Sequence, residues 1–397
     1  MSIVKKSHRM QPELTAWRRH LHQHPELSFE EHHTQQFILE ALREMGLDPK
    51  PIGGTGVVAD IGDGPGGVAI RADIDALPLM EESTAPYVSQ NPGVMHACGH
   101  DGHTAILLGV ARLLAEQGES LPGHIRLMFQ PAEERIPGGA RDLIRDGVLD
   151  GIDRVVGLHL SSDIPTGSAG VVLGPQTANA DSFTIVVEGR GGHGAKPEQT
   201  VDAVVVGSQL VGALQTIVSR SLSPRNPAVV TVGMFQAGSN FNIIAPRATL
   251  KGTVRTFSAD DRELVKQRMA ELAEHISRAY GASVAIDYQD GYPSVVNTPA
   301  ETAITHSVIR RVLGEDAVAP LEPIMAGEDF SYYQQHCPGT FLMLGCGNPE
   351  IGAQYPHHHP QFTLDEEALP LGVALLAETA LEFLLINPER MPREGAS

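Results

Sequence analysis

The sequence His124-Ile-Arg-Leu-Met-Phe-Gln-Pro-Ala-Glu-Glu134 joins an apolar segment to a proline and an acidic pair. The apolar segment predicts a β-strand, which Pro131 ends. Further apolar segments bounded by glycine or proline alternate along the chain with segments of helical apolar spacing. This alternation predicts an α/β domain with a largely parallel sheet. The expected strands are 56–61, 68–72, 124–130, 154–159 and 341–344, and the expected helices are 13–22, 29–45, 104–117, 300–313 and 365–385.

A different pattern occupies residues 181–291. Its predicted elements follow the order strand, helix, strand, strand, helix, strand, at 182–188, 201–221, 228–234, 249–256, 259–279 and 283–288. This is the order of a ferredoxin-like α+β unit. We therefore expect a discontinuous α/β domain, residues 1–180 and 292–397, interrupted by an inserted domain at 181–291.

The composition is that of a globular, acidic protein. The chain has 397 residues, of which 42% are hydrophobic and 19% charged, and this suffices for two domains with buried cores. Lys and Arg total 29 against 48 Asp and Glu, a formal net charge of −19. The excess of negative charge argues against nucleic acid and anionic membranes as partners. We find no stretch with the roughly 18 consecutive apolar residues of a membrane span.

The N-terminus and the cysteines favour the cytoplasm. Residues 1–12 are polar and no apolar segment follows them, so no secretory signal is seen. The three cysteines are Cys98, Cys337 and Cys346. An odd, sparse set fits a reducing compartment better than a disulfide framework.

A group of candidate metal ligands begins at His96. Cys98 and His100 are one residue apart, and on an extended or turn segment this spacing points both side chains to the same side. Thiolate and imidazole are ligands of divalent transition metals. The alternative is a glycine-rich turn with a buried thiol and a helix-capping histidine. We expect Asp101 to cap the following helix, and His103 to support the ligands rather than bind metal.

The acidic pair Glu133-Glu134 stands at the end of a predicted strand. Ligands of open α/β sheets collect outside the carboxyl ends of strands. Adjacent side chains project differently, so one glutamate can bind a metal while the other acts as a general base. The alternative interpretation is a solvated acidic loop.

Other candidates lie at strand ends and in a histidine triplet. His159 ends one predicted strand, and Asp73 follows another as a candidate partner of a ligating histidine. A buried core histidine and a strand-end turn are the alternatives. The run His357-His-His359 by itself predicts only a surface loop.

The inserted domain offers candidates for substrate recognition. His193 lies in the turn Gly191-Gly-His-Gly194, and Asn242 and Arg255 lie on or near predicted strands. An arginine can hold a carboxylate in a bidentate pair. Turn formation and surface charge are the alternatives.

In order and spacing, these motifs resemble those of the metal-dependent aminoacylase and hippurate hydrolase family, which includes plant auxin-conjugate hydrolases and N-acetyl-diaminopimelate deacetylases. The resemblance covers nearly the whole chain, and the ordered set is much more specific than any one segment. The segments are RRHLHQHPELS at 18–28, RADIDALP at 71–78, the cysteine-histidine cluster at 96–104, PAEE at 131–134, GLH at 157–159, GEDF at 327–330 and HHP at 358–360.

The resemblance implies a zinc-peptidase-like catalytic domain with two divalent metal ions, and an inserted lid or dimerisation domain. The metal ligands that it implies are Cys98, His100, Glu134, His159 and His358. Glu133 would be the general base, and His193 would contact the substrate, often across a dimer interface. Asn242 and Arg255 match residues associated with the substrate carboxylate, and Asp73 would lie behind a ligating histidine.

The sequence departs from the family pattern at a few positions. Gly194 and Pro197-Glu198 stand where the family has Ala and later Pro-His, and Ala326 stands where Gly is common. The three histidines at 357–359 compete for the last ligand position, and their place relative to Pro360 favours His358. These departures bear on substrate choice more than on the reaction.

The implied reaction is hydrolysis of an N-acyl amino acid, of the hippurate or N-acetyl type, to a carboxylic acid and a free amino acid. The metals would be Zn, Mn, Co or Ni, and we expect a homodimer or a higher homo-oligomer. One alternative is a dipeptidase or carboxypeptidase with the same site, and another is a non-catalytic metal-binding relative, against which the complete ligand set and Glu133 argue. A nicotinamide-dependent oxidoreductase has little support, because the glycines near Gly53 and Gly62 lack the fingerprint spacing before a helix.

Overall fold

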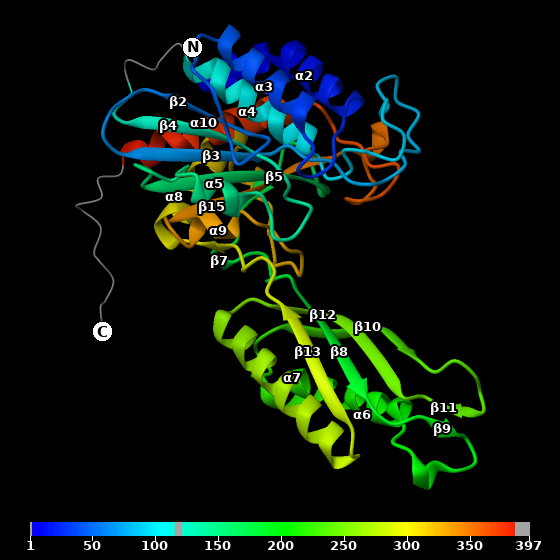
Figure 1. Cartoon of the computed structure of the whole chain (residues 1–397). Coiled ribbons are helices and arrows are strands. Elements are labelled where there is room, and N and C mark those ends of the chain that lie inside the picture. Colours follow the sequence, from blue (N-terminus) through cyan, green and yellow to red (C-terminus); the bar gives the residue numbers. More distant parts are fainter. Residues whose placement is uncertain (1, 116–120, 386–397) are drawn as a thin grey trace, which may run out of the picture. The chain divides into compact units, whose positions relative to one another are not determined.

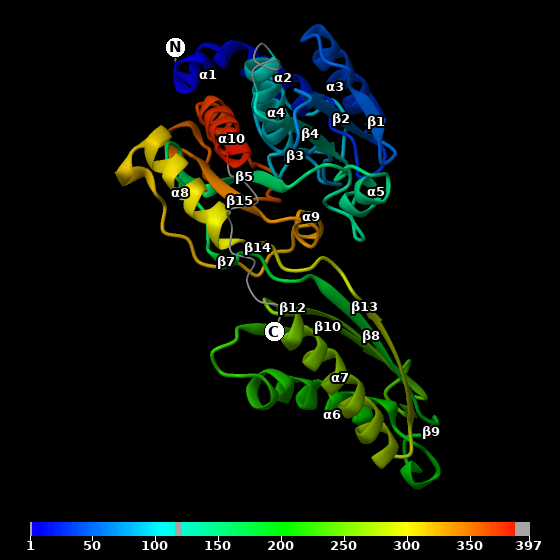
Figure 2. The ribbon, with the colours of Figure 1, turned by 90° about the vertical axis from the view of Figure 1, so that its left-hand side faces the viewer.

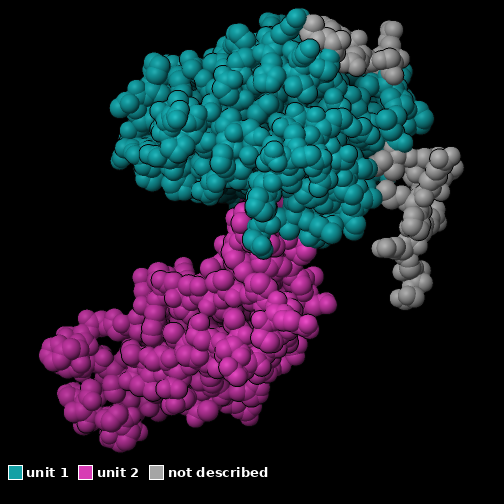
Figure 3. All heavy atoms as spheres, turned by 180° about the vertical axis from the view of Figure 1, so that it is seen from behind, with its two compact units in different colours: residues 1–174, 296–322, 329–397 teal, residues 175–295, 323–328 magenta. Residues whose placement is uncertain are grey.

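The computed structural model describes residues 2–115 and 121–385, and the chain divides into two compact units. Unit 1 contains Met1–Gly174, Val296–Glu322 and Asp329–Ser397, and unit 2 contains Pro175–Val295 and Pro323–Glu328. Figure 3 shows the two units in different colours. The expected inserted domain, 181–291, falls inside unit 2.

Unit 1 is built on a seven-stranded sheet in the order β1-β2-β4-β3-β5-β15-β6. The four central strands are parallel, whereas β1, β2 and β6 pair in antiparallel fashion toward the edges. This mixed sheet with helices confirms the predicted α/β class. The strands are β1 (Lys50–Ile52), β2 (Gly56–Ile61), β3 (Gly67–Asp73), β4 (His124–Gln130), β5 (Arg154–Pro165), β6 (Ala169–Gly170) and β15 (Gly339–Gly347); the short strands β7 (Gly174–Pro175) and β14 (Val296–Asn297) lie near the unit boundary.

Helices pack against this sheet because its central strands are apolar on both faces. Every residue of β3 is buried, as expected for a strand covered on two sides. Helix α4 packs against β3 and β4, and α10 packs against β3 and β5 (Figure 1). The helices of unit 1 are α1 (Ile3–Arg9), α2 (Gln11–Gln23), α3 (His32–Glu44), α4 (His100–Ala115), α5 (Ala140–Arg145), α8 (Pro299–Leu313), α9 (Ser331–Gln334) and α10 (Ala368–Leu385), with short 3₁₀ turns at Glu315–Ala317 and Pro349–Ile351.

Unit 2 is an antiparallel sheet in the order β10-β12-β8-β13, against which α6 and α7 pack (Figure 2). Burial alternates along β8, so that Phe183, Ile185 and Val187 enter the apolar core of this unit. Strand order and connectivity are those of a ferredoxin-like unit. Its elements are β8 (Asp181–Glu188), β9 (Gly192–His193), a 3₁₀ turn (Pro197–Gln199), α6 (Ala203–Thr216) continued by a π-helical turn (Ile217–Ser221), β10 (Ala228–Ala237), β11 (Ile243–Ile244), β12 (Arg247–Thr256), α7 (Ala259–Ala279) and β13 (Ser283–Gln289).

Two helical stretches, Ala203–Ser221 and Ala368–Leu385, are long and apolar enough to cross a membrane by length and composition, which the sequence analysis did not anticipate. Two thirds of the second stretch is buried inside unit 1. The first buries one face, which includes Val206 and Leu210, in the core of unit 2. Packing in a core explains the apolar composition of such helices.

Three boundaries near the site differ from those expected. Helix α3 begins at His32 rather than Phe29, because a turn over 27–30 precedes it. Helix α4 begins at His100, four residues before the expected start. Strand β5 continues to Pro165, so His159 lies within the strand rather than at its end.

Candidate metal centre

The carboxyl ends of β3 and β4 lie side by side, because Asp73 and Gln130 are register partners in these parallel strands. The segment after β3 carries Asp75, and the segment after β4 carries Glu133 and Glu134. The Asp75 carboxylate accepts hydrogen bonds from the backbone N–H groups of Glu133 (3.1 Å) and Glu134 (3.0 Å). Asp75, which the sequence analysis did not single out, therefore fixes the acidic turn.

A second buried carboxylate holds the same turn from the other side. Ala132 has a φ of 55°, and its N–H donates to Oε1 of Glu31 over 2.8 Å. Oε2 of Glu31 accepts from the Thr55 hydroxyl. Burial raises the pKa of Glu31 to about 7.

Cys98, His100 and His159 form a first triad of potential ligands. Their ligand atoms lie within 4.8 Å of one another, and Cys98 Sγ is 3.5 Å from Nε2 of His159. His100 is the first residue of α4, and its Nδ1 lies 2.9 Å from the Asp75 carbonyl oxygen. This contact leaves Nε2 of His100 facing the cluster.

Cys98, Glu134 and His358 form a second triad within the same 4.8 Å limit. Glu134 Oε1 lies 3.2 Å from Nε2 of His358. His358 has a φ of 63°, and its N–H donates to the carbonyl of Ala97. Because the two triads share Cys98, the structure brings together all five side chains that the sequence predicts as ligands.

The three histidines at 357–359 point to different neighbours. The His357 ring lies 5.1 Å from the His159 ring, centroid to centroid. His359 stacks on Tyr355 at 4.5 Å. Of the triplet, His358 is the residue that faces Glu134, as the position relative to Pro360 suggested.

Asp73 and His103 lie beside the ligand cluster, with Oδ2 of Asp73 3.6 Å from Nε2 of His100. Asp73 lies 2.6 Å from Nδ1 of His103 and accepts from Arg71, also over 2.6 Å. The Leu160 N–H donates to Nε2 of His103 over 2.9 Å. Both ring nitrogens of His103 are thus engaged, and His103 is placed to support the site rather than to bind a metal.

The cluster has a strong negative field. Although burial opposes it, the Asp73 and Asp75 carboxylates raise the pKa of His100 to about 10. Burial, together with Glu134 and Glu133, raises the pKa of the Cys98 thiol well above its usual value. The same carboxylates that hold these protons would attract a divalent cation in their place.

The donor set fits such a cation. Nε2 of His100 is buried and makes no hydrogen bond, which is costly for a polar group with no other partner. One thiolate, three imidazoles and one carboxylate are ligands that Zn and its neighbours accept. The five side chains fit one or more transition-metal ions, and their role as ligands stays a prediction.

Asp101 does not cap a helix, and that expectation was wrong. Because α4 begins at His100, Asp101 lies inside its first turn, fully buried. Its Oδ2 accepts from Nε of Arg18 (2.8 Å) and lies 2.8 Å from Nδ1 of His22. The sequence indicated Arg18 and His22, the two partners of Asp101, only through the family resemblance of the segment 18–28.

The remaining candidates belong to unit 2. His193 pairs with Ile243 between β9 and β11, and its Nδ1 accepts from the Ala195 N–H over 3.0 Å. Asn242 is exposed, and Arg255, half-buried on β12, donates to the carbonyl of Val254 over 3.1 Å. Their roles toward the substrate stay predictions.

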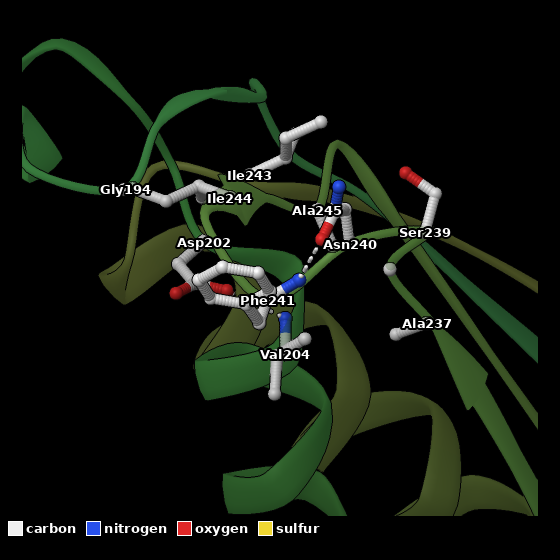
Figure 4. Close-up of a pocket in the computed structure, with 11 residues that line it drawn as sticks. Gly194, Asp202, Val204, Ala237, Ser239, Asn240, Phe241, Ile243, Ile244 and Ala245 are labelled. Atoms are coloured by element: carbon white, nitrogen blue, oxygen red, sulfur yellow. Dashed lines mark hydrogen bonds between the residues drawn. The ribbon is translucent and has the colours of Figure 1, made fainter.

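An open hollow of about 600 Å³ lies beside the short β9–β11 strand pair, which carries His193. Figure 4 shows Gly194, Asn240 and Ile244 among its lining residues. Phe241 at its rim is 99% exposed. Its lining is mixed, with apolar side chains such as Val204 and Ile243 beside the polar side chains of Asp202 and Asn240.

An α/β unit with thiolate, imidazole and carboxylate groups gathered at its strand ends is typical of metal-dependent hydrolases. Residues 69–382 match the protein family described as "Peptidase family M20/M25/M40", and the chain belongs to this family. The chain is 44% identical over 384 residues to the N-acetyl-L-cysteine deacetylase of Bacillus subtilis, covering 96% of this chain and 90% of that one.

Two further similarities agree with this assignment. The N-acyl-L-amino acid amidohydrolase of Geobacillus stearothermophilus is 48% identical over 288 residues, which are 72% of this chain and 78% of that one. The crystal structure of the Bacillus subtilis YXEP protein, described as a dinuclear metal binding peptidase from the M20 family, matches with a TM-score of 0.83 at 37% identity. That match covers 94% of this chain and 98% of the other.

Proposed function

We propose that this chain is a metal-dependent amidohydrolase that cleaves the amide bond of N-acyl amino acids, giving a carboxylic acid and a free amino acid. The observation that carries the proposal is the convergence of Cys98, His100, Glu134, His159 and His358 in one cluster. The names of the deacetylase and amidohydrolase relatives support the substrate class.

The cluster is suited to activate water beside an amide. Two divalent ions, which the dinuclear relative supports, would lower the pKa of a water molecule and polarise the amide carbonyl. Glu133 lies with its carboxylate oxygen within 4.8 Å of the ligand atoms of His100 and Glu134. From there it would take the proton of the attacking water and return it to the leaving amine.

Preorganisation of the base is built into the backbone. Asp75 holds the N–H groups of both glutamates, and Glu31 holds the residue before them. A base fixed in this way loses little entropy when substrate binds. We propose that His193 of the inserted domain stabilises the oxyanion, and that Asn242 and Arg255 hold the substrate carboxylate.

A second candidate function is a dipeptidase or carboxypeptidase with the same site. The description of the YXEP protein as a peptidase favours it. The two functions share the chemistry and differ in the group on the acyl side of the amide, which is an amino acid in one case and a simple acid in the other.

One panel of substrates tests both. Metal-free protein would be reloaded with Zn, Mn, Co or Ni and assayed on N-acetyl, N-benzoyl and indole-acetyl amino acids and on dipeptides. We expect kcat/KM to be highest on the N-acyl amino acids. A preference for dipeptides would favour the second function, and no hydrolysis with any metal would contradict both.

We further propose that the enzyme works in the cytoplasm as a homodimer or a higher homo-oligomer, with residues 181–291 as a lid and dimerisation domain. The three cysteines are free, which suits a reducing compartment. A formal net charge of −19 supports a small-molecule substrate rather than a nucleic acid or membrane partner.

A further inference from the structure

Among the described residues, three that are not glycine have a positive φ: Phe29 (68°), Ala132 (55°) and His358 (63°). Such backbone conformations persist only where the surroundings impose them, and they concentrate at functional sites. Ala132 directly precedes Glu133, and His358 is a proposed ligand. The site therefore accounts for two of the three, and Phe29 needs a separate explanation.

Phe29 occupies a position that favours glycine. The Glu30 N–H donates to the carbonyl of Leu27 over 2.9 Å, which closes a four-residue turn with Phe29 as its third residue. Turns with a positive φ at that place select Gly or Asn, because other side chains clash with the backbone. A bulky aromatic residue is the unfavourable choice for this turn.

Core packing does not compensate for this strain. Phe29 is half-buried, and the described apolar clusters of unit 1 do not include it. An aromatic ring usually offsets an unfavourable backbone through burial in a core. Here the ring stays partly open to solvent, so folding alone gives no reason for phenylalanine.

The turn is joined directly to the acidic segment of the site. The Ser28 hydroxyl donates to Oδ2 of Asp75 over 2.6 Å, and the same oxygen accepts from the Glu134 N–H. On the other side, the guanidinium carbon of Arg135 lies 6.0 Å from the centroid of the Phe29 ring. Phe29 is thus held next to the residue that follows Glu134.

We propose that Phe29 is a specificity-determining residue whose ring packs against an apolar group of the substrate. This inference rests on the proposed amidohydrolase function. Arg135 keeps the ring in place through a cation–π contact and gives this edge of the site a positive charge. An aromatic face beside a guanidinium suits a substrate that is both apolar and anionic, as an N-acyl amino acid with an alkyl or aromatic substituent is.

The test uses two substitutions that relieve the strain and remove the ring, Phe29→Gly and Phe29→Asn, beside Phe29→Leu, which keeps an apolar side chain. One substrate series lengthens the acyl group from N-acetylglycine to N-hexanoyl- and N-benzoylglycine. The other enlarges the amino acid from N-acetylglycine to N-acetylleucine and N-acetylphenylalanine. Metal content and the urea midpoint of unfolding are measured for each variant.

We expect Phe29→Gly and Phe29→Asn to keep their metal and to unfold at a urea concentration no lower than the wild type. In one of the two series, kcat/KM on the bulky substrates should fall about 10- to 100-fold relative to N-acetylglycine. Phe29→Leu should retain most of the preference. The series that changes identifies the half of the substrate that contacts the ring.

A matched pair of arginine variants tests the supporting contact. Arg141 is also exposed and lies 5.8 Å from the Tyr332 ring. We expect Arg135→Ala to weaken the same preference, and Arg141→Ala to leave it unchanged. If kcat/KM of the Phe29 variants fell equally on all substrates, or if these variants unfolded at lower urea with unchanged substrate preference, the role of Phe29 would be overturned and the proposed function would stand. A wild-type protein inactive on both series would overturn the proposed function, and this inference with it.

Discussion

The roles of the two adjacent glutamates can be separated by single substitutions. Glu133→Gln should retain metal, because the amide keeps the shape of the side chain and Glu133 is not among the proposed ligands. Turnover should fall about 10²- to 10⁴-fold, because an amide does not take up the proton of water. Glu134→Gln should instead lose metal along with activity. Metal content by atomic emission and kcat on an N-acetyl amino acid check both, and near-normal turnover of metal-loaded Glu133→Gln would exclude Glu133 as the base.

Glu31 should make stability depend on pH. Burial raises its pKa from 4.5 to about 7 in the folded protein, so the folded state favours the protonated carboxyl. The contribution of Glu31 to stability is therefore complete below pH 4.5 and is lost as the pH rises through 7. A pKa difference of this size corresponds to about 3 kcal/mol of unfolding free energy.

Glu31→Gln isolates this effect from other titrating groups. The unfolding free energy of the wild type, minus that of the variant, should decrease between pH 4.5 and 7.5 and then level off. Urea unfolding at a series of pH values measures the difference. A difference that stays constant over this range would contradict the raised pKa.

Residue types and the family resemblance identified the candidate ligands, with Asp73 and His103 as supporting groups, but not the role of Asp75. Thiol, imidazole and carboxylate side chains are recognisable in the sequence, and their order carried the family resemblance. Asp75 acts through two backbone N–H groups, a contact that depends on two strand ends being neighbours. Within the histidine triplet the position relative to Pro360 favoured His358, but local residue preferences would not predict its positive φ.

At the scale of elements, a buried ion pair joins α2 to α4. Arg18 and Asp101 are both fully buried, and their side chains are 2.8 Å apart. Asp101→Asn should leave the buried arginine with Glu366, 3.3 Å from its Nη1, as its remaining counter-charge, at a cost of up to about 3–5 kcal/mol in unfolding free energy. Measurement on the metal-free protein excludes effects through the neighbouring His100.

An exposed pair within one helix gives the control for this prediction. Asp142 and Arg145 are 2.6 Å apart on the surface of α5. Solvent and salt screen such a pair, so Asp142→Asn should leave the unfolding free energy nearly unchanged. If Asp101→Asn and Asp142→Asn changed the unfolding free energy equally, the buried pair would stabilise the fold no more than the exposed one.

Elements with strong periodicity were predicted with nearly correct ends, whereas the starts of α3 and α4 and the end of β5, near the site, were not. Helix α7 spans the expected 259–279, because its apolar residues keep helical spacing and Ser258 caps its first turn. Helix α4 begins four residues early because tertiary contacts, including the Arg18–Asp101 pair, stabilise its polar first turn. The late start of α3 follows from the strained turn at Phe29. In both cases long-range contacts outweigh local preference.

At the scale of the molecule, the change of pattern near residue 181 indicated a second unit. Sequence order gave its ferredoxin-like connectivity, since each predicted strand and helix appears in unit 2. The assembly state does not follow from this order, because it depends on which surfaces remain exposed. In unit 2, β10 is an edge strand of its sheet, and Phe235 on it is 39% exposed. On α6, Val204 and Val205 are exposed as well.

These exposed groups favour pairing of unit 2 with its copy, because an edge strand has unpaired backbone groups and a symmetric dimer would cover them. If His193 of one subunit serves Glu133 of the other, two inactive variants should complement each other. His193→Ala and Glu133→Gln chains, tagged differently and mixed in equal amounts, would form one intact site in each heterodimer. Recovered activity should then approach about a quarter of the wild-type value, since half of the dimers are mixed and each has one working site. Heterodimers isolated by both tags but lacking activity would show that His193 acts within its own chain or has no catalytic role.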